Sequence, residues 1–121
     1  MQKILIVEDD KFLRDLLKAK LEKDSNFSVV SAIDGEEGIK KIEEEKPDIV
    51  LLDLILPNMD GFDVLENIKG NPNISKTKVI VLSNLGQEED LEKAISLGAK
   101  DYLVKAHFTL DEIIVKIKKY L

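Results

Sequence analysis

The segment 49–62, IVLLDLILPNMDGF, places a single carboxylate, Asp53, between apolar residues on both sides. An ionised carboxylate is costly to bury unless it has a partner, so its position at the end of an apolar run calls for an explanation. Three other short apolar runs also end in polar side chains. These side chains are Glu8 and Asp9 after KILIV, Ser83 at the end of KVIVLS, and Lys105 after DYLV.

These side chains are chemically complementary. Three carboxylates within reach of one another repel by roughly 4 kcal/mol per close pair at an effective dielectric near 20. A divalent cation would relieve that repulsion, and oxygen-only ligands in a chain without cysteine favour Mg²⁺. The ammonium of Lys105 and the hydroxyl of Ser83 could then donate to phosphate oxygens. The set predicts a site for a phosphoryl group if the fold brings it together.

The hydrophobic pattern predicts elements that would do so, because short aliphatic runs alternate strictly with segments of helical spacing. Five strands and five helices in alternation predict an α/β domain with a doubly wound parallel sheet, helices on both faces and ligands at the carboxyl ends of the strands. Strands are predicted over Lys3–Glu8, Phe27–Ile33, Ile49–Asp53, Lys78–Ser83 and Asp101–Lys105. Helices are predicted over Lys11–Lys23, Gly35–Lys46, Phe62–Lys69, Gln87–Leu97 and from Thr109 to the end.

Local signals support the helices. Asp34 is a predicted N-cap, Thr109 and Glu112 form a capping-box pattern, and Gly98 is a predicted C-terminal stop. The first helix is expected to carry one apolar stripe, formed by Phe12, Leu13, Leu16, Leu17 and Leu21.

Composition narrows the function. The 121 residues suit one domain, 1–121, and no apolar stretch approaches the roughly 18 residues that span a bilayer. A net charge of −6 argues against nonspecific nucleic-acid binding, although three lysines cluster near the C-terminus (Lys116, Lys118 and Lys119). With no signal-peptide pattern, we expect a cytoplasmic protein without membrane attachment.

Taken singly, each polar residue also has an ordinary explanation. Glu8 or Asp9 could cap the following helix, Ser83 could open a loop and Lys105 could be a solvated charge. Asp53 is harder to explain in this way, because its neighbours are apolar.

Over nearly its full length the chain resembles the receiver domains of two-component response regulators, of the CheY type. The matching segments are ILIVEDD, LLDLILPNMDG, VIVLSN and GAKDYLVKA. The resemblance implies a flavodoxin-like (βα)5 fold with strand order 2-1-3-4-5. It also implies that Asp53 accepts a phosphoryl group from the phosphohistidine of a sensor kinase or phosphotransfer protein.

The resemblance further assigns roles around Asp53. Glu8, Asp9, Asp53 and the backbone carbonyl of Ile55 would hold Mg²⁺, and Lys105 would contact the phosphoryl oxygens. Ser83 and Tyr102 would act as switch residues that change the surface of the fourth helix, fifth strand and fifth helix for a downstream protein. A Tyr102 that simply packs at a strand edge is the alternative for that residue.

Three positions depart from the common family pattern. Ser83 replaces a more frequent Thr, which preserves the hydroxyl, and Asn84 stands where Ala or Gly is usual. Asn84 could crowd the phosphorylation site or simply bond local backbone. Ala106 stands where the family usually has Pro, and without Pro the family's cis peptide would cost roughly 3 kcal/mol.

Ile55 and Leu85 lie two residues beyond Asp53 and Ser83, where we expect them to flank an acyl phosphate. Apolar side chains there would exclude water rather than orient it. Together with Asn84 they are candidates for tuning the lifetime of the phosphorylated form, and we expect slow self-dephosphorylation.

Two other functional classes are considered. A phosphatase of the haloacid dehalogenase type would need a second Asp at position 55, which is Ile, and a degenerate receiver would bind partners without phosphorylation. We expect no enzyme beyond a signalling module that catalyses its own phosphorylation and dephosphorylation. We also expect a stand-alone receiver rather than a fragment of a longer regulator, and homodimerisation on phosphorylation stays open.

Overall fold

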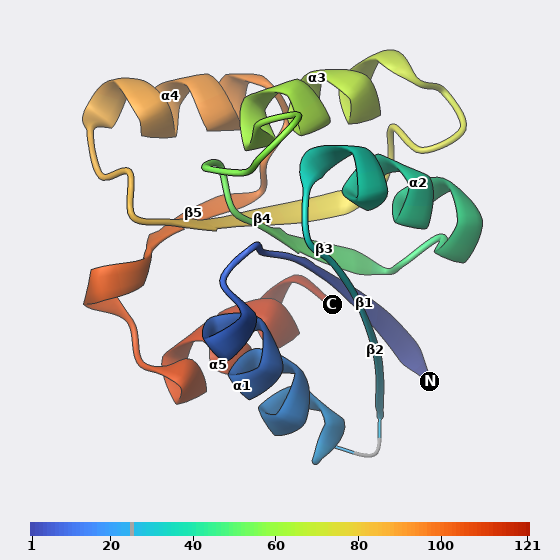
Figure 1. Ribbon diagram of the computed structural model, residues 1–121, viewed down its shortest axis with the longest axis vertical. Coiled ribbons are helices and arrows are strands. Elements are labelled where there is room, and N and C mark those ends of the chain that lie inside the picture. The colour runs from blue at the N-terminus through green and yellow to red at the C-terminus, as the bar shows by residue number, and fades with distance from the viewer. Residues whose placement is uncertain (25) are drawn as a thin grey trace.

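Each aliphatic run of the sequence forms a strand and each segment of helical spacing forms a helix (Figure 1). A computed structural model describes residues 1–24 and 26–121. The strands are β1 (Gln2–Val7), β2 (Phe27–Ala32), β3 (Ile49–Leu52), β4 (Lys78–Ser83) and β5 (Asp101–Val104). The helices are α1 (Lys11–Glu22), α2 (Gly35–Glu45), α3 (Gly61–Gly70), α4 (Glu88–Ser96) and α5 (Leu110–Tyr120).

The strands form one parallel sheet in the order β2-β1-β3-β4-β5. This order confirms the predicted flavodoxin-like α/β class. Figure 1 shows α2, α3 and α4 on one face of the sheet and α1 and α5 on the other. In the register, Val7 of β1 is opposite Leu52 of β3, and Ser83 of β4 is opposite Val104 of β5. The carboxyl ends of neighbouring strands therefore lie at one edge.

Two hydrophobic clusters hold the layers together, one on each face of the sheet. Successive residues of a strand point to opposite faces, so Leu5 and Val7 belong to the cluster under α2, α3 and α4. Ile4 and Ile6 belong to the cluster that Leu17 and Leu21 of α1 and Ile113 and Ile117 of α5 complete. Burial on both faces explains why the strands read as continuous aliphatic runs.

The predicted helix signals are confirmed at three places. The Asp34 side chain accepts the Glu37 amide, the capping box of Thr109 and Glu112 is complete in both directions, and Gly98 has a positive φ of 107°. Two caps were not predicted. Asp10 caps α1 by accepting the amides of Phe12 and Leu13, and Asp60 caps α3 by accepting the Asp63 amide.

Two kinds of detail in the prediction were wrong. The predicted strands β1, β2, β3 and β5 extended to Glu8, Ile33, Asp53 and Lys105, but each of these strands ends one residue earlier, so these residues lie just beyond their strands. Phe12 and Leu16 are not part of the buried stripe of α1: Phe12 is 75% exposed and Leu16 is 39% exposed. Both lie outside the face that α1 turns to the sheet.

Within the ranges 1–24 and 26–121, every peptide bond is trans, including the one that joins Lys105 to Ala106. A 3-10 turn, η1 (Lys105–His107), follows β5 and was not predicted. No helix of the described chain is both long enough and apolar enough to cross a bilayer.

Candidate functional site

The sheet brings Glu8, Asp53 and Lys105 together although they are far apart in the sequence. The backbone amide of Asp53 donates to the carbonyl of Val7 at 3.0 Å, and that of Glu8 donates to the carbonyl of Ala32 at 3.0 Å. These bonds continue the strand ladders by one residue. Glu8 and Asp53 therefore follow adjacent strands at the same edge, and Lys105 reaches them from the end of β5.

Lys105 bridges the two acids. Its Nζ lies 2.7 Å from Oε1 of Glu8 and 2.8 Å from Oδ2 of Asp53. Both carboxylates are buried, with Glu8 3% and Asp53 5% exposed. Charge-assisted bonds of this length are among the stronger hydrogen bonds in proteins. One cation therefore serves two buried anions, which explains how Asp53 is tolerated within its apolar run.

The other carboxylate oxygens accept backbone amides. Oε2 of Glu8 accepts the amide of Asp10 at 3.1 Å, and Oδ1 of Asp53 accepts the amide of Ile55 at 3.2 Å. Within the described part of the chain, no buried side-chain oxygen or nitrogen lacks a hydrogen-bond partner. Both acids are held in place from two sides.

Burial raises the pKa of Glu8 to about 7, because water no longer solvates its charge. The bonds from Lys105 and from the Asp10 amide partly offset this, while the negative charge of Asp53 adds to it. Burial alone would lower the pKa of Lys105, but its bonds to Asp53 and Glu8 outweigh burial and raise it. The acids of the pocket therefore outnumber its one cation, and Lys105 stays protonated.

A divalent cation fits this deficit. Glu8, Asp9 and Asp53 each offer a carboxylate oxygen, and these oxygens lie within 4.8 Å of one another. Asp9 is exposed, so the cluster opens to solvent. With all three carboxylates ionised and one ammonium, the side chains carry a net charge of −2, and hard oxygen ligands match Mg²⁺. The residues present therefore fit a magnesium ion.

Ser83 and Tyr102 both hydrogen-bond to the loop between β4 and α4. Ser83 is fully buried and its Oγ accepts the amide of Leu85 at 3.3 Å. The Tyr102 hydroxyl donates to the carbonyl of Leu85, and burial raises its pKa to about 12, with Asp90 and Asp53 adding to the shift. Both side chains thus contact the same residue of this loop. Among the described residues, Ser83 has no hydrogen bond to Asp53 or Lys105.

The three residues predicted to tune the phosphorylated form lie in loops that follow β3 and β4. Ile55 is 54% exposed, Asn84 is exposed and Leu85 is partly buried against the core. Of these three, Leu85 is the one that bonds to both switch candidates.

Sequence reasoning missed Arg14. Its guanidinium Nη1 donates to the backbone carbonyls of Glu8 at 2.9 Å and of Asp9 at 3.3 Å. It thereby ties α1 to the turn that carries both acids. The sequence signal for this role was weak: Arg14 is a cation in the first turns of a helix that follows an acidic turn. Such pairs of opposite charges about four residues apart are ordinary features of helices, so the pattern did not single out Arg14.

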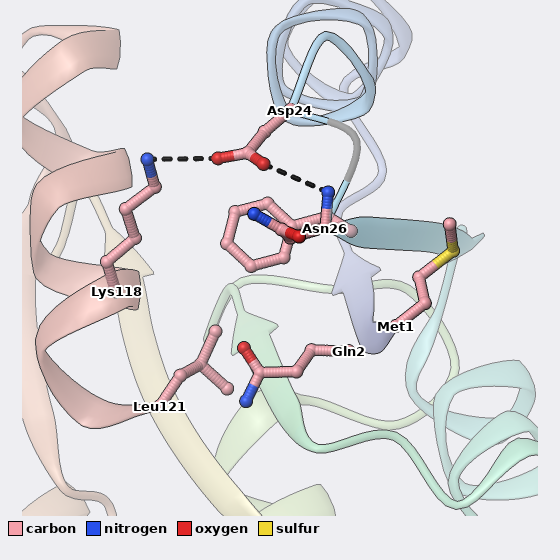
Figure 2. A pocket seen from close by; sticks show the side chains of 7 residues that line it. Met1, Gln2, Asp24, Asn26, Lys118 and Leu121 are labelled. Atoms are coloured by element: carbon pink, nitrogen blue, oxygen red, sulfur yellow. Dashed lines mark hydrogen bonds and ion pairs between the residues drawn. The ribbon is translucent and has the colours of Figure 1, made fainter.

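A separate cleft of about 480 Å³ lies at the opposite, amino-terminal edge of the sheet (Figure 2). In Figure 2, Lys118 of α5 reaches Asp24, with Nζ to Oδ2 at 3.0 Å, and Asp24 also accepts the amide of Asn26. Lys116 pairs with Asp101 at 3.7 Å, so two of the three C-terminal lysines are engaged by acids. We assign no chemistry to this cleft.

Comparison with known proteins agrees with the fold and with the arrangement of the acids and Lys105 at the carboxyl edge of the sheet. The family model described as response regulator receiver domain matches residues 4–118. Chemotaxis protein CheY of Listeria monocytogenes is 42% identical over 120 residues, covering 98% of each chain. The alkaline phosphatase synthesis transcriptional regulatory protein PhoP of Bacillus subtilis is 36% identical over 120 residues, which are 99% of this chain but 48% of PhoP. The solved Francisella response regulator 1452 receiver domain superposes with a TM-score of 0.90 at 31% identity, covering 99% of this chain and 96% of that one.

Proposed function

Because the chain belongs to the response regulator receiver domain family, we propose that it accepts a phosphoryl group on Asp53 in a reaction that requires Mg²⁺. The donor would be the phosphohistidine of a sensor kinase or of a phosphotransfer protein. The observation that carries the proposal is the bridge from Lys105 to both Glu8 and Asp53, with Asp9 within metal-ligand distance. Receiver domains are signalling modules, and the catalysis proposed here is confined to the domain's own phosphorylation and dephosphorylation.

In the proposed transfer, an oxygen of Asp53 attacks the phosphorus atom while the bond from phosphorus to the histidine nitrogen breaks. Phosphoryl transfer depends mainly on positioning and on neutralising charge. The amide of Ile55 holds one oxygen of Asp53 in place, and Lys105 supplies positive charge beside the other. When bound by Glu8, Asp9, Asp53 and the carbonyl of Ile55, Mg²⁺ would neutralise charge on the transferred group.

The donor would dock beside α1. Phe12 and Leu16 present exposed apolar side chains on this helix, and Arg14 fastens the helix to the acidic turn. An exposed apolar patch next to a reactive group is typical of a protein-binding surface. A protein that carries the phosphohistidine is the occupant we propose, since the acidic chain does not suit nucleic acid.

The output would follow from a shift between two conformations. The phosphoryl group adds charge and acceptor oxygens, so it favours a conformation whose side chains bond to it. Ser83 is the candidate that would leave the Leu85 amide for a phosphoryl oxygen. Because Tyr102 bonds to the carbonyl of the same Leu85, movement of this loop would reach β5 and the surface of α4, β5 and α5. We propose that a downstream protein, or a second copy of the chain, reads that surface.

Intact mass after incubation with acetyl phosphate and Mg²⁺ tests the proposal. The unmodified chain should gain one phosphoryl group, and Asp53→Asn should gain none. No gain in the unmodified chain would indicate a degenerate receiver. Catalytic release of phosphate from many small phosphomonoesters would favour the phosphatase alternative, which the apolar Ile55 side chain argues against. Size measurement of the phosphorylated form against Asp53→Asn tests homodimerisation.

A further inference from the structure

The loop between β3 and α3, residues 53–60, is tied to the start of α2. The amide Nδ2 of Asn58 donates to Oδ2 of Asp34 at 2.9 Å. The other oxygen of the same carboxylate, Oδ1, accepts the backbone amide of Glu37 at 2.8 Å. Asp34 therefore caps α2 with one oxygen and holds the loop with the other, across 24 residues of sequence.

The backbone of the loop also lies directly against α2. A Cβ atom on Gly35, the first residue of α2, would lie 2.1 Å from the carbonyl oxygen of Met59. Asn58 itself has a left-handed backbone, with φ of 68°, a conformation that asparagine tolerates better than most residues. The side chain of Asn58 thus bonds to Asp34 from the residue of this loop that has a left-handed backbone.

The other end of the loop is equally constrained. The amide of Gly61 donates to the carbonyl of Leu54 at 2.9 Å, and a Cβ on Gly61 would lie 2.4 Å from the carbonyl oxygen of Asp53. Between this contact and the Asn58 contact lies Ile55, whose carbonyl is the proposed metal ligand. Its amide already bonds to Oδ1 of Asp53. Ile55 is therefore held between two fixed points.

We propose that Asn58 and Asp34 are positioning residues for the metal site, and this inference rests on the proposed function. Mg²⁺ demands near-ideal octahedral geometry, so a backbone carbonyl that is not held in place must be ordered when the ion binds. The bond from Asn58 to Asp34 orders the loop beforehand. Its loss should weaken Mg²⁺ binding about three- to tenfold, as expected for one hydrogen bond.

Three variants test this. Asn58→Gly removes the side chain but keeps a residue that adopts the left-handed backbone. Asp34→Ser keeps an oxygen to cap α2 and removes the one that Asn58 uses. The exchange Asp34→Asn/Asn58→Asp restores the bond in reverse, since an asparagine side chain on the α2 cap can accept with its oxygen and donate with its nitrogen. The exchange also leaves the net charge unchanged.

The measurement is the dissociation constant for Mg²⁺ alone, by calorimetry, together with the urea unfolding midpoint in EDTA. Each single variant should bind Mg²⁺ about three- to tenfold more weakly than the unmodified chain. The double variant Asn58→Gly/Asp34→Ser should bind Mg²⁺ no more weakly than the weaker single variant, because both changes remove the same bond. The exchange should restore the dissociation constant to within about twofold of that of the unmodified chain. Unchanged affinity in Asn58→Gly, or an exchange that fails to recover it, overturns this inference alone. An unmodified chain that binds no Mg²⁺ overturns the proposed function and the inference with it.

Discussion

Replacing Lys105 by methionine should destabilise the protein in a way that depends on pH. Methionine keeps a flexible apolar stem of similar length but leaves the carboxylates of Glu8 and Asp53 without their shared cation. Removing one partner of a buried ion pair is strongly destabilising, because the remaining charge is left uncompensated. Glu8 loses the same partner, but it becomes an uncompensated charge only at a pH at which it is ionised.

The expected magnitude follows from the pKa of Glu8, which is about 7 with Lys105 in place. At pH 6 Glu8 is mostly protonated in both proteins, so the variant loses mainly the charged bond to Asp53, at about 2 kcal/mol. At pH 8 Glu8 is ionised in the unmodified protein, but losing Lys105 raises its pKa further. Each pH unit between the two pKa values adds about 1.4 kcal/mol, so the loss should approach about 3.5 kcal/mol at pH 8.

Urea unfolding in EDTA at pH 6 and pH 8 measures this loss, followed by far-ultraviolet circular dichroism because the chain has no tryptophan. Lys40→Met, at an exposed position on α2, is the matched control and should change stability little at either pH. Adding Mg²⁺ should restore Lys105→Met more than it stabilises the unmodified protein, since the ion replaces the lost charge. An equal loss at both pH values would refute the reasoning, because it would show that Lys105 acts through packing rather than charge.

Three further outcomes are expected. In the metal-free protein, Glu8 keeps its proton in the folded state up to a pH of about 7, whereas the unfolded state releases it near pH 4.5. The free energy of unfolding should therefore fall by up to about 3 kcal/mol as pH rises from 4.5 to about 7. A free energy of unfolding that does not change over this range would contradict the prediction. Gly61→Ala would place a Cβ against the main-chain oxygen of Asp53, the proposed phosphoryl acceptor. It should lower the free energy of unfolding, measured with urea, by about 2 kcal/mol, and it should slow phosphorylation by acetyl phosphate. Gly70→Ala is its control, since a Cβ there meets nothing within 4 Å and should stabilise α3 by up to about 1 kcal/mol. Ile55→Asn/Leu85→Glu should hydrolyse its acyl phosphate faster, as followed by intact mass over time, and an unchanged or slower rate would reject a water-excluding role for these side chains.

The fold could be predicted from the sequence because each element carries its own local signal. Strand runs buried on both faces are dominated by aliphatic residues, and helical segments are marked by caps such as Asp34 and the pair Thr109 and Glu112. The alternation of strands and helices along the chain then predicts a parallel sheet, and the strands of a parallel sheet all have their carboxyl ends at the same edge. Glu8 and Asp53 could be placed together for that reason alone.

What could not be predicted depends on three-dimensional contacts. The apolar spacing of α1 includes Phe12 and Leu16, but the rotation of the helix about its own axis, which tertiary packing sets, decides that Leu17 and Leu21 face the sheet. Among the consecutive acids Glu8, Asp9 and Asp10, the cap of α1 is the third, and the sequence rule alone does not choose between the neighbouring aspartates.

The bond from Asn58 to Asp34 is a second case of this kind. It joins the loops that follow β2 and β3, two strands that β1 separates in the sheet, and this close contact is possible because Gly35 has no Cβ atom. Neither residue carries a local signal for such a partner.

Because successive strand residues point to opposite faces, the sheet separates the hydrophobic core into two clusters. Leu5 and Ile6 are consecutive in the chain, yet they pack against different sets of helices and share no cluster. A change of volume on one side is therefore absorbed there and reaches the other side only through the backbone of the strands. In evolutionary terms, the layer with α2, α3 and α4 can be reshaped without a matching change beneath α1 and α5, so one half of the domain can diverge while the other is kept.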